Sequence, residues 1–381
     1  MDEKIIDMES QKKAKQYSRL QRRLMVIEIV FSLIFILAWL IFGWSKELKA
    51  ILNEYTNNQW LLVAIFGMLF GGFYYLLSLP LSYYEGFIIP HRFDLSTQTM
   101  NGWILDQGKI LIIGGILGGL MLEIVYAFLR LFPDWWWLGA GIILLIFNVI
   151  LANLAPLIIF PIFYKFVPLE NEFEELSKRL IKLADQAGAH VQGVFKFDMS
   201  RRTKLANAGL TGLGNTRRII LGDTLLNEFS EEEIETVLAH ELGHHVHNDI
   251  PLEMIVGSAI TMIGLYLSGL GLKAATAFWG YNGPGDIASL PLFLLVIGFY
   301  GLVTMPLGNA FSRWRERLAD EYAMQLTGNN SAYVSALIRL ANQNLAEIDP
   351  APWEEFLLHS HPALGKRIAL AKTWTGRKNS Q

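Results

Sequence analysis

Long apolar runs constrain the fold of this chain more than any other feature of its sequence. They occupy residues 29–45, 57–84, 135–164, 254–272 and 287–312, each near or beyond the length that crosses a bilayer. A sixth run, 110–132, is interrupted by Glu123 and Arg130. The core of a soluble protein seldom needs an uncharged run as long as 57–84. We therefore predict six transmembrane helices, the one at 135–164 being kinked by Pro156 and Pro161.

The composition supports a protein whose partner is the lipid bilayer. Hydrophobic residues make up 52% of the chain, and the formal net charge is only −3. So small a charge argues against a nucleic-acid partner. Cysteine is absent, which excludes disulfides and thiolate-ligated metal sites.

The distribution of basic residues predicts the orientation in the membrane. The segment before the first apolar run is polar and basic, has no cleavage site of a signal peptide, and should stay in the cytosol. Six crossings then return the C-terminus to the same side. The stretch of about 90 residues between the fourth and fifth spans would also be cytosolic. Basic residues that agree with this topology are Lys12, Lys13, Lys15, Arg19, Arg22, Arg23, Arg313, Arg315, Arg317, Lys366, Arg367 and Lys372.

The fold class we predict is mainly α, a polytopic membrane protein with a small α+β domain on the cytosolic side. A helix is expected at 172–187 and strands at 194–197, 205–211 and 217–221, the last two joined by a Gly212–Asn215 turn. Helices are expected at 331–348 and 362–374. The chain then divides into a membrane region (1–164), a soluble insertion (165–250), two further spans (251–312) and a C-terminal helical segment (313–381).

One helix of the insertion carries a His-Glu-Leu-Gly-His sequence at 240–244. Ser230 and Glu233 form a capping box, so the helix should run from about 231 to 248. His240 and His244 stand one turn apart on one face and can reach a single Zn²⁺. Glu241 lies beside that face, where its carboxylate can take a proton from water. The pattern is typical of a zinc hydrolase.

A catalytic zinc needs a third protein ligand, and two positions compete for it. His247 lies on the same helical face, although a straight helix places it a turn too far from His240. The distant alternative is Glu316, on a helix that follows the last span. Asp320 is spaced i, i+4 from Glu316 and could accept a hydrogen bond from a ligand imidazole. Without further context, Glu316 and Asp320 would also suit a surface charge cluster.

Several separated motifs resemble those of the integral-membrane zinc endopeptidases that include the CAAX prenyl proteases. The resemblance covers most of the chain from about residue 80. The motifs are Leu154-Ala155-Pro156-Leu157, Asn207-Ala208-Gly209, the segment 218–226, the segment 240–244, Arg313 with 316–320, and His359-Ser360-His361-Pro362 followed by Arg367.

This resemblance implies a role for each matching residue. His240, His244 and Glu316 would bind one Zn²⁺, Glu241 would act as general base and then acid, and Asp320 would support a ligand. Asn207 and Ala208 would lie on an edge strand that pairs with an extended peptide. His361 and Arg367 would contact the substrate carbonyl or its C-terminal end. From the sequence alone, His361 could be an oxyanion stabiliser or a helix-cap residue.

The resemblance also implies a barrel of membrane helices around a water-filled chamber, which Glu28, Glu123 and Arg130 would face. We count six spans where the eukaryotic enzymes have seven, which suggests a prokaryotic member in the plasma membrane. The favoured activity is cleavage near the C-terminus of membrane-associated or lipidated peptides. Two alternatives are a stress-related quality-control protease and a metal transporter with a cytosolic cluster of His240, His244, His245 and His247. Transporters place ligands inside their spans, and none of these spans carries a histidine.

Overall fold

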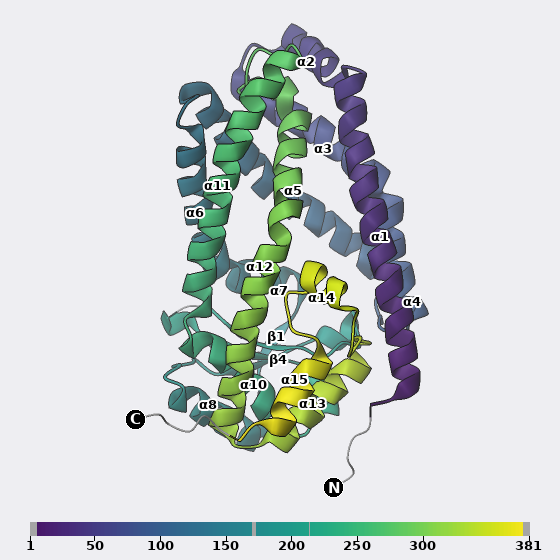
Figure 1. Cartoon of the computed structure of the whole chain (residues 1–381), viewed down its shortest axis with the longest axis vertical. Helices are drawn as coiled ribbons and strands as arrows, with labels where there is room; N and C mark the ends of the chain where they lie inside the picture. Colours follow the sequence, from purple (N-terminus) through teal and green to yellow (C-terminus); the bar gives the residue numbers. More distant parts are fainter. Residues whose placement is uncertain (1–5, 170–172, 213, 376–381) are drawn as a thin grey trace.

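Six long apolar helices dominate the computed structural model, which describes residues 6–169, 173–212 and 214–375. Each is long and apolar enough to cross a membrane, so the six predicted spans are confirmed. Figure 1 shows α1, α11 and α12 along the long axis, with α2 (Trp44–Tyr55) at one end and a small sheet toward the other. The spans are Met8–Ile41 (α1), Gln59–Arg92 (α3, η1 and α4), Met100–Leu131 (α5), Trp136–Phe163 (α6, η2 and α7), Asp249–Phe278 (α11) and Ile287–Thr327 (η6 and α12).

Two of these helices extend well past their apolar runs at the sheet-bearing end. The side chain of Asp7 caps α1 by accepting hydrogen bonds from the backbone of Glu9 and Ser10, so the helix begins at Met8. Helix α12 (Leu290–Thr327) continues without a break for 38 residues. Our expectation of a separate helix after the last span was wrong, and the boundary that we placed at 312/313 falls inside α12. The polar part of α12, after residue 312, is therefore a rigid continuation of a membrane helix.

Proline distorts the fourth span where the sequence predicts. A π-helical turn, Ala155–Ile159 (η2), contains Pro156 and separates α6 (Trp136–Leu154) from α7 (Phe160–Phe163). A similar turn, Tyr84–Ile88 (η1), separates α3 (Gln59–Tyr83) from α4 (Ile89–Arg92). Both turns relieve backbone groups that cannot keep regular α-helical pairing near proline.

The insertion forms a four-stranded sheet of order β1-β2-β4-β3. The strands are Phe166–Pro168 (β1), Val194–Phe197 (β2), Ala208–Thr211 (β3) and Arg218–Gly222 (β4). Strand β1 was not predicted, and β3 begins three residues later than expected. Ala206, two residues before it, is held outside the sheet, because its N–H donates to Oδ1 of Asn344 at 2.9 Å. Strands β3 and β4 pair antiparallel, which confirms the predicted hairpin; Leu213 of its turn lies outside the described residues.

Helix α10 (Glu231–Val246) carries the histidine motif and has the predicted capping box. Its Ile234, Leu238 and Leu242 are buried in one core with Ile219 and Leu221 of β4. The sheet therefore occupies one side of α10 and leaves the histidine face for other elements. The helix ends two residues earlier than predicted. Asn248 takes a left-handed conformation, φ 54°, and α11 (Asp249–Phe278) begins in a new direction.

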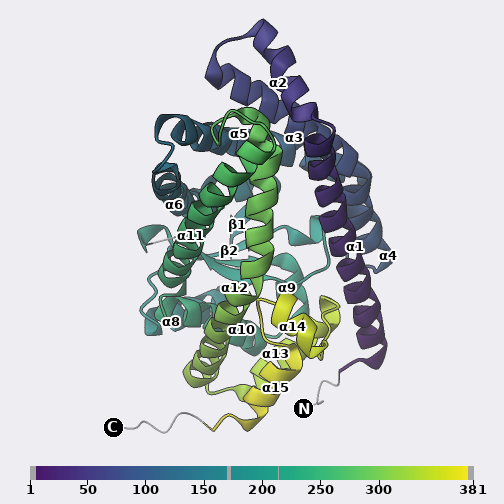
Figure 2. The same ribbon diagram turned by 45° about the horizontal axis from the view of Figure 1, so that its top comes forward.

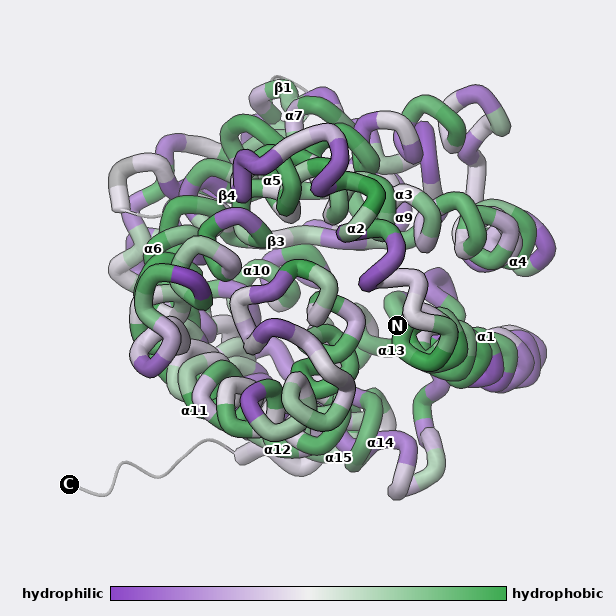
Figure 3. Tube along the Cα trace, turned by 90° about the horizontal axis from the view of Figure 1, so that it is seen from above, coloured by the Kyte–Doolittle hydropathy of each residue, from purple (hydrophilic) through white to green (hydrophobic). Residues whose placement is uncertain are grey.

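Shorter helices complete the sheet-bearing end (Figure 2). The predicted helix at 172–187 is α8 (Glu174–Gln186), and its expected first residue lies outside the described part of the chain. Helices α9 (Asp223–Glu228) and α14 (Pro352–Leu358) were not predicted. The two predicted C-terminal helices are present as α13 (Asn330–Gln343) and α15 (Leu364–Thr373). Seen from above in Figure 3, α10 and β3 lie between α6 on the left and α1 on the right.

Candidate active site

His240 and His244 point from α10 toward α12. Their Nε2 atoms lie 3.3 Å apart, and the two rings are nearly perpendicular, with an interplanar angle of 87°. His240 is 8% exposed, so only one edge of the pair is open to solvent. The i, i+4 spacing thus brings two imidazole nitrogens to one point, as predicted from the sequence.

Glu316 of α12 reaches the same point. Its Oε2 lies 3.3 Å from Nε2 of His240, and its Oε1 lies 3.4 Å from Nε2 of His244. The three candidate ligand atoms are all within 4.8 Å of one another. Oε2 of Glu316 is buried, and among the described residues no donor other than His240, whose alignment with it is poor, lies within reach of it; a cation at this place would satisfy it. Two imidazole nitrogens and a carboxylate oxygen are a donor set that suits zinc.

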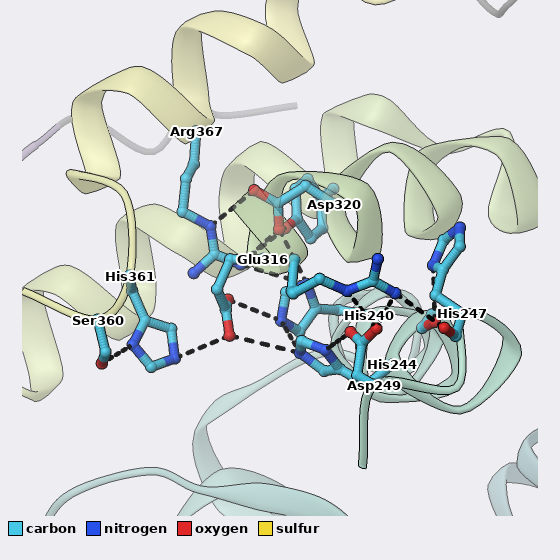
Figure 4. Close-up of polar contacts among 12 residues, drawn as sticks. His240, His244, His247, Asp249, Glu316, Asp320, Ser360, His361 and Arg367 are labelled. Carbon is cyan, nitrogen blue, oxygen red and sulfur yellow. Dashed lines mark hydrogen bonds and ion pairs between the residues drawn. The ribbon is translucent and has the colours of Figure 1, made fainter. Parts of the chain in front are cut away.

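Each histidine is oriented by a carboxylate on its other ring nitrogen (Figure 4). Oδ1 of Asp320 lies 2.9 Å from Nδ1 of His240, and Oδ2 of Asp249 lies 2.7 Å from Nδ1 of His244. With Nδ1 as the donor, the lone pair of each imidazole is on Nε2 and faces Glu316. Asp320 was predicted from the sequence, whereas Asp249 was not. Its only signal was an aspartate directly after the end of the motif helix.

Buried arginines hold both carboxylates in place. Arg367 of α15 donates from Nε and a terminal nitrogen to Asp320, at 2.9 and 2.7 Å, and Tyr333 donates to the same carboxylate. Arg315 of α12 donates from Nε to Asp249 at 2.6 Å. We expected Arg367 to contact substrate, but its side chain is only 11% exposed and directed to Asp320. Its geometry supports a role in fixing Asp320 instead.

His361, in the segment after α14, lies close to the cluster of His240, His244 and Glu316. Its Nε2 lies 3.1 Å from Oε1 of Glu316, and its Nδ1 is 2.9 Å from the hydroxyl of Ser360. The side chain is 60% exposed, unlike the others in the cluster. An exposed imidazole beside a buried polar centre can meet a group that arrives from solvent. Its position therefore agrees with a contact to substrate and not with a helix cap.

The other histidines of the motif helix lie outside the cluster. Nδ1 of His247 is 2.8 Å from the carbonyl oxygen of Gly243, and its ring packs at 5.9 Å from that of Tyr322. Nε2 of His245 is 3.4 Å from a terminal nitrogen of Arg217. The local alternative for a third ligand, His247, is therefore not supported by the geometry, because α10 turns it away.

The electrostatic surroundings of His240 favour a positive charge. Burial alone would lower the pKa of this imidazole, but hydrogen bonds to Asp320 and Glu316 outweigh burial and raise the pKa to about 9. The same effects raise the pKa of His244, through Glu316 and Asp249. A site that attracts protons this strongly also attracts a metal cation.

Asn207 and Ala208 lie at the open edge of the sheet. Strand β3 is last in the strand order, and the Asn207 carbonyl accepts a hydrogen bond from the N–H of Gly222 at 2.9 Å. Ala208 is opposite Leu221, one position along the ladder. Because antiparallel residues alternate in direction, the N–H and C=O of Ala208 point away from β4, as do those of Leu210. These groups can pair with an added strand.

Comparisons with known proteins agree with this fold and this site. The model of peptidase family M48 matches residues 170–375, and that of the CAAX prenyl protease N-terminal region, described as five membrane helices, matches residues 3–165. The described part of that region holds four membrane-length helices. The fold and the site define a multi-pass membrane metalloprotease. The chain belongs to peptidase family M48.

Its relatives span bacteria and eukaryotes. The chain is 30% identical to the uncharacterized metalloprotease YhfN of Bacillus subtilis, over 94% of this chain and 84% of that protein. It is 33% identical to CAAX prenyl protease 1 of Saccharomyces cerevisiae, over 77% and 68% of the two chains. The crystal structure of S. mikatae Ste24p superposes with a TM-score of 0.84 at 27% identity, covering 96% of this chain and 89% of that one. The first two are named as proteases, and none of the three supports the transporter alternative.

Proposed function

We propose that this metalloprotease is a zinc endopeptidase whose metal is held by His240, His244 and Glu316. The observation that carries the proposal is the convergence of three ligand atoms, with each imidazole already oriented through Nδ1 by a buried carboxylate. When bound, zinc would supply Lewis-acid chemistry, by polarising a peptide carbonyl and making water more acidic.

Glu241 is the candidate general base. It follows His240 directly on α10 and is half-buried, so part of its side chain is open to solvent. We propose that it takes a proton from the attacking water and then delivers it to the nitrogen of the departing amine. Both transfers need one carboxylate that stays in place through the reaction, and the rigid helix provides it.

His361 is the candidate stabiliser of the developing oxyanion. Its Nε2 lies near Glu316 and its ring is open to solvent, so it can donate a hydrogen bond to the carbonyl oxygen of a bound peptide. Arg367 would act indirectly, because it holds Asp320 and, through Asp320, His240.

The peptide is proposed to bind as an added strand along β3. Outward-facing groups of Ala208 and Leu210 would pair with its backbone, and Asn207 would lie where the strand begins. Backbone pairing is tolerant of sequence, which suits a protease that accepts several peptides. Since the relatives in eukaryotes are named CAAX prenyl proteases, we propose substrates that are membrane-associated or lipidated near their C-termini.

A defined peptide set tests this function. Purified enzyme would be given matched C-terminal peptides, prenylated and unprenylated, with and without a chelator. We expect cleavage that chelation abolishes and added Zn²⁺ restores. Cleavage that survives complete removal of metal would contradict the metal assignment, whereas equal cleavage of the two peptides would contradict only the lipidated substrate.

We also propose that the sheet-bearing end and both termini face the cytosol, in a prokaryotic plasma membrane. The basic residues before the first apolar run support this orientation. The chain has no cysteine, so single cysteines at the exposed positions His190, Lys372 and Asn282 give a clean labelling test. In intact cells an impermeant reagent should label only position 282. Labelling of position 190 or 372 in intact cells would show that the protein has the opposite orientation in the membrane.

A further inference from the structure

Helix α14 exposes its aromatic side chains and buries its carboxylates. Trp353 and Phe356, three positions apart on one face, are 56% and 55% exposed. Glu354 and Glu355, on the other side, are each 7% exposed. A short helix on a water-facing surface has the opposite arrangement, with charges outside and aromatic rings inside.

The buried carboxylates are fully engaged by the rest of the protein. Glu354 forms an ion pair with Arg22 of α1 at 3.1 Å. Glu355 accepts a hydrogen bond from Nζ of Lys366 at 2.6 Å and another from the N–H of Ala363 at 3.1 Å. These bonds fix the rotation of α14 about its axis, so the aromatic face is held outward by the fold.

Contacts with α1 show how far α14 lies from the apolar part of the molecule. Arg22, its partner on α1, is among the last charged residues before the first span becomes apolar. Beyond Arg22, the next large exposed apolar side chains of α1 are Val26 and Ile27, about 6 Å further along the helix. Helix α14 therefore lies at the level where the surface of α1 changes from polar to apolar.

Contacts with α12 give the same level independently. Asn309 of α12 donates to the carbonyl oxygen of Leu357 at 2.7 Å, and Arg313 donates to the carbonyl oxygens of Glu355 and His359 at 2.8 and 2.6 Å. The apolar run of α12 ends between these two residues, at 312. Trp314, next in the chain, is 53% exposed.

The figures place α14 at the margin of the molecule. In Figure 1 it lies between α12 and α1, nearer to the membrane helices than α13 and α15 are. From above, in Figure 3, it lies on the periphery between the same two helices. Helix α14 therefore lies beside two helices that cross the bilayer.

We propose that α14 lies in the interfacial layer of the bilayer, with Trp353 and Phe356 inserted among the lipids. Aromatic side chains favour this layer, where a ring can leave water without losing contact with polar headgroups. The exposed Arg23 lies at the same level and can meet anionic headgroups. Because the chain reaches His361 three residues after α14, the bilayer itself would position the segment that completes the active site.

Spin labels on single cysteines test the proposal in the full chain, reconstituted in nanodiscs of phosphatidylcholine and phosphatidylglycerol. Trp353→Cys and Phe356→Cys would each carry a nitroxide, and collisions with oxygen and with a nickel chelate would be compared. Both labels should collide with oxygen more than with the chelate, at a depth of about 5–10 Å into the leaflet. Lys372→Cys, at an exposed position in the last turn of the neighbouring α15, is the water-exposed control and should show the reverse.

Two outcomes would overturn the proposal. Preferential collision of the 353 and 356 labels with the nickel chelate would place this face in water, as in an internal aqueous chamber. Protection from both reagents would mean that a second protein copy covers it. Each variant would first be shown to cleave peptide as the parent does, so that a misfolded protein is not measured. The assignment does not depend on the zinc ligands, and its failure would leave the proposed protease function unchanged.

Discussion

Gly243 of α10 lies directly against Ala319 of α12. A Cβ on Gly243 would come within 2.8 Å of the Ala319 Cα and 3.0 Å of its carbonyl oxygen, both backbone atoms that cannot move aside separately. This close crossing is what brings Glu316 to the two histidines, because Gly243 precedes His244 and Ala319 is one turn after Glu316. Gly243 is the fourth residue of the histidine motif, so the motif supplies both the ligands and the space for the helix that completes them.

Gly243→Ala should therefore separate α10 from α12 and weaken metal binding and peptide cleavage together. Overpacking of this kind costs about 1–3 kcal/mol of stability. Gly308→Ala is the matched control. Gly308 lies on α12, the helix that Gly243 contacts, and it has open space around its Cβ position. The check is metal content and thermal unfolding of both variants. Normal metal content in Gly243→Ala would show that the crossing is more tolerant than we infer.

Glu241→Gln should abolish cleavage and leave the metal in place. The amide has the same shape but cannot take a proton from water, and it is not among the three proposed ligands. The loss expected from removing a general base is on the order of 10²- to 10⁴-fold. Single-turnover assays with parallel metal analysis measure both effects. An enzyme with near-normal turnover would remove Glu241 from the mechanism.

Glu316→Ala and His247→Ala distinguish the two candidates for the third ligand. The first variant should lose metal affinity and activity together, since it removes charge and geometry at once. The second should keep stoichiometric metal, because His247 faces the Gly243 carbonyl and Tyr322. Titration with Zn²⁺ and a competing chelator gives both affinities. The reverse result would mean that the metal site is built within one helix and its end.

Asp249→Asn should reduce metal affinity about 10- to 100-fold, as expected when a partner that orients a ligand histidine is weakened. The amide keeps the size of the side chain but no longer carries the charge that pairs with Arg315 and favours donation from His244. Asp320→Asn should act in the same way on His240. If either variant binds metal as tightly as the parent does, that carboxylate serves structure alone. Circular dichroism would show whether the fold is retained.

Ala208→Pro should impair peptide binding and leave the sheet intact. Proline removes an N–H that points to the open edge, where the substrate strand is proposed to pair. Gly209→Pro is the contrasting change, because residue 209 directs its N–H toward Ile220 of β4 and its loss should destabilise the hairpin. For Ala208→Pro we expect a raised KM or lost activity with normal unfolding and metal content. Unchanged kinetics would place the peptide elsewhere.

Most of the fold could be predicted because its signals are local. Hydrophobic runs mark the six spans, and the Ser230 capping box marks the start of the motif helix. Two of the missed elements, β1 and α14, are short and are stabilised by distant partners. β1 pairs with β2 across the whole of α8, and α14 is held by Arg22 and Arg313. The two partners in each of these interactions are far apart in the sequence, so a local sequence pattern does not reveal them.

The sequence by itself determined the membrane class of this protein and the chemistry of its motif helix, because the apolar runs, the i, i+4 pair of histidines and the glutamate between them are properties of one helix at a time. Tertiary structure decided which distant groups meet that helix. The close crossing at Gly243 places Glu316, and not His247, beside the two histidines, and the turn at Asn248 places Asp249 next to His244. The tertiary structure also directs the Arg367 side chain toward Asp320. These contacts depend on where helices that are distant in the sequence cross in space. A local sequence pattern does not contain that information.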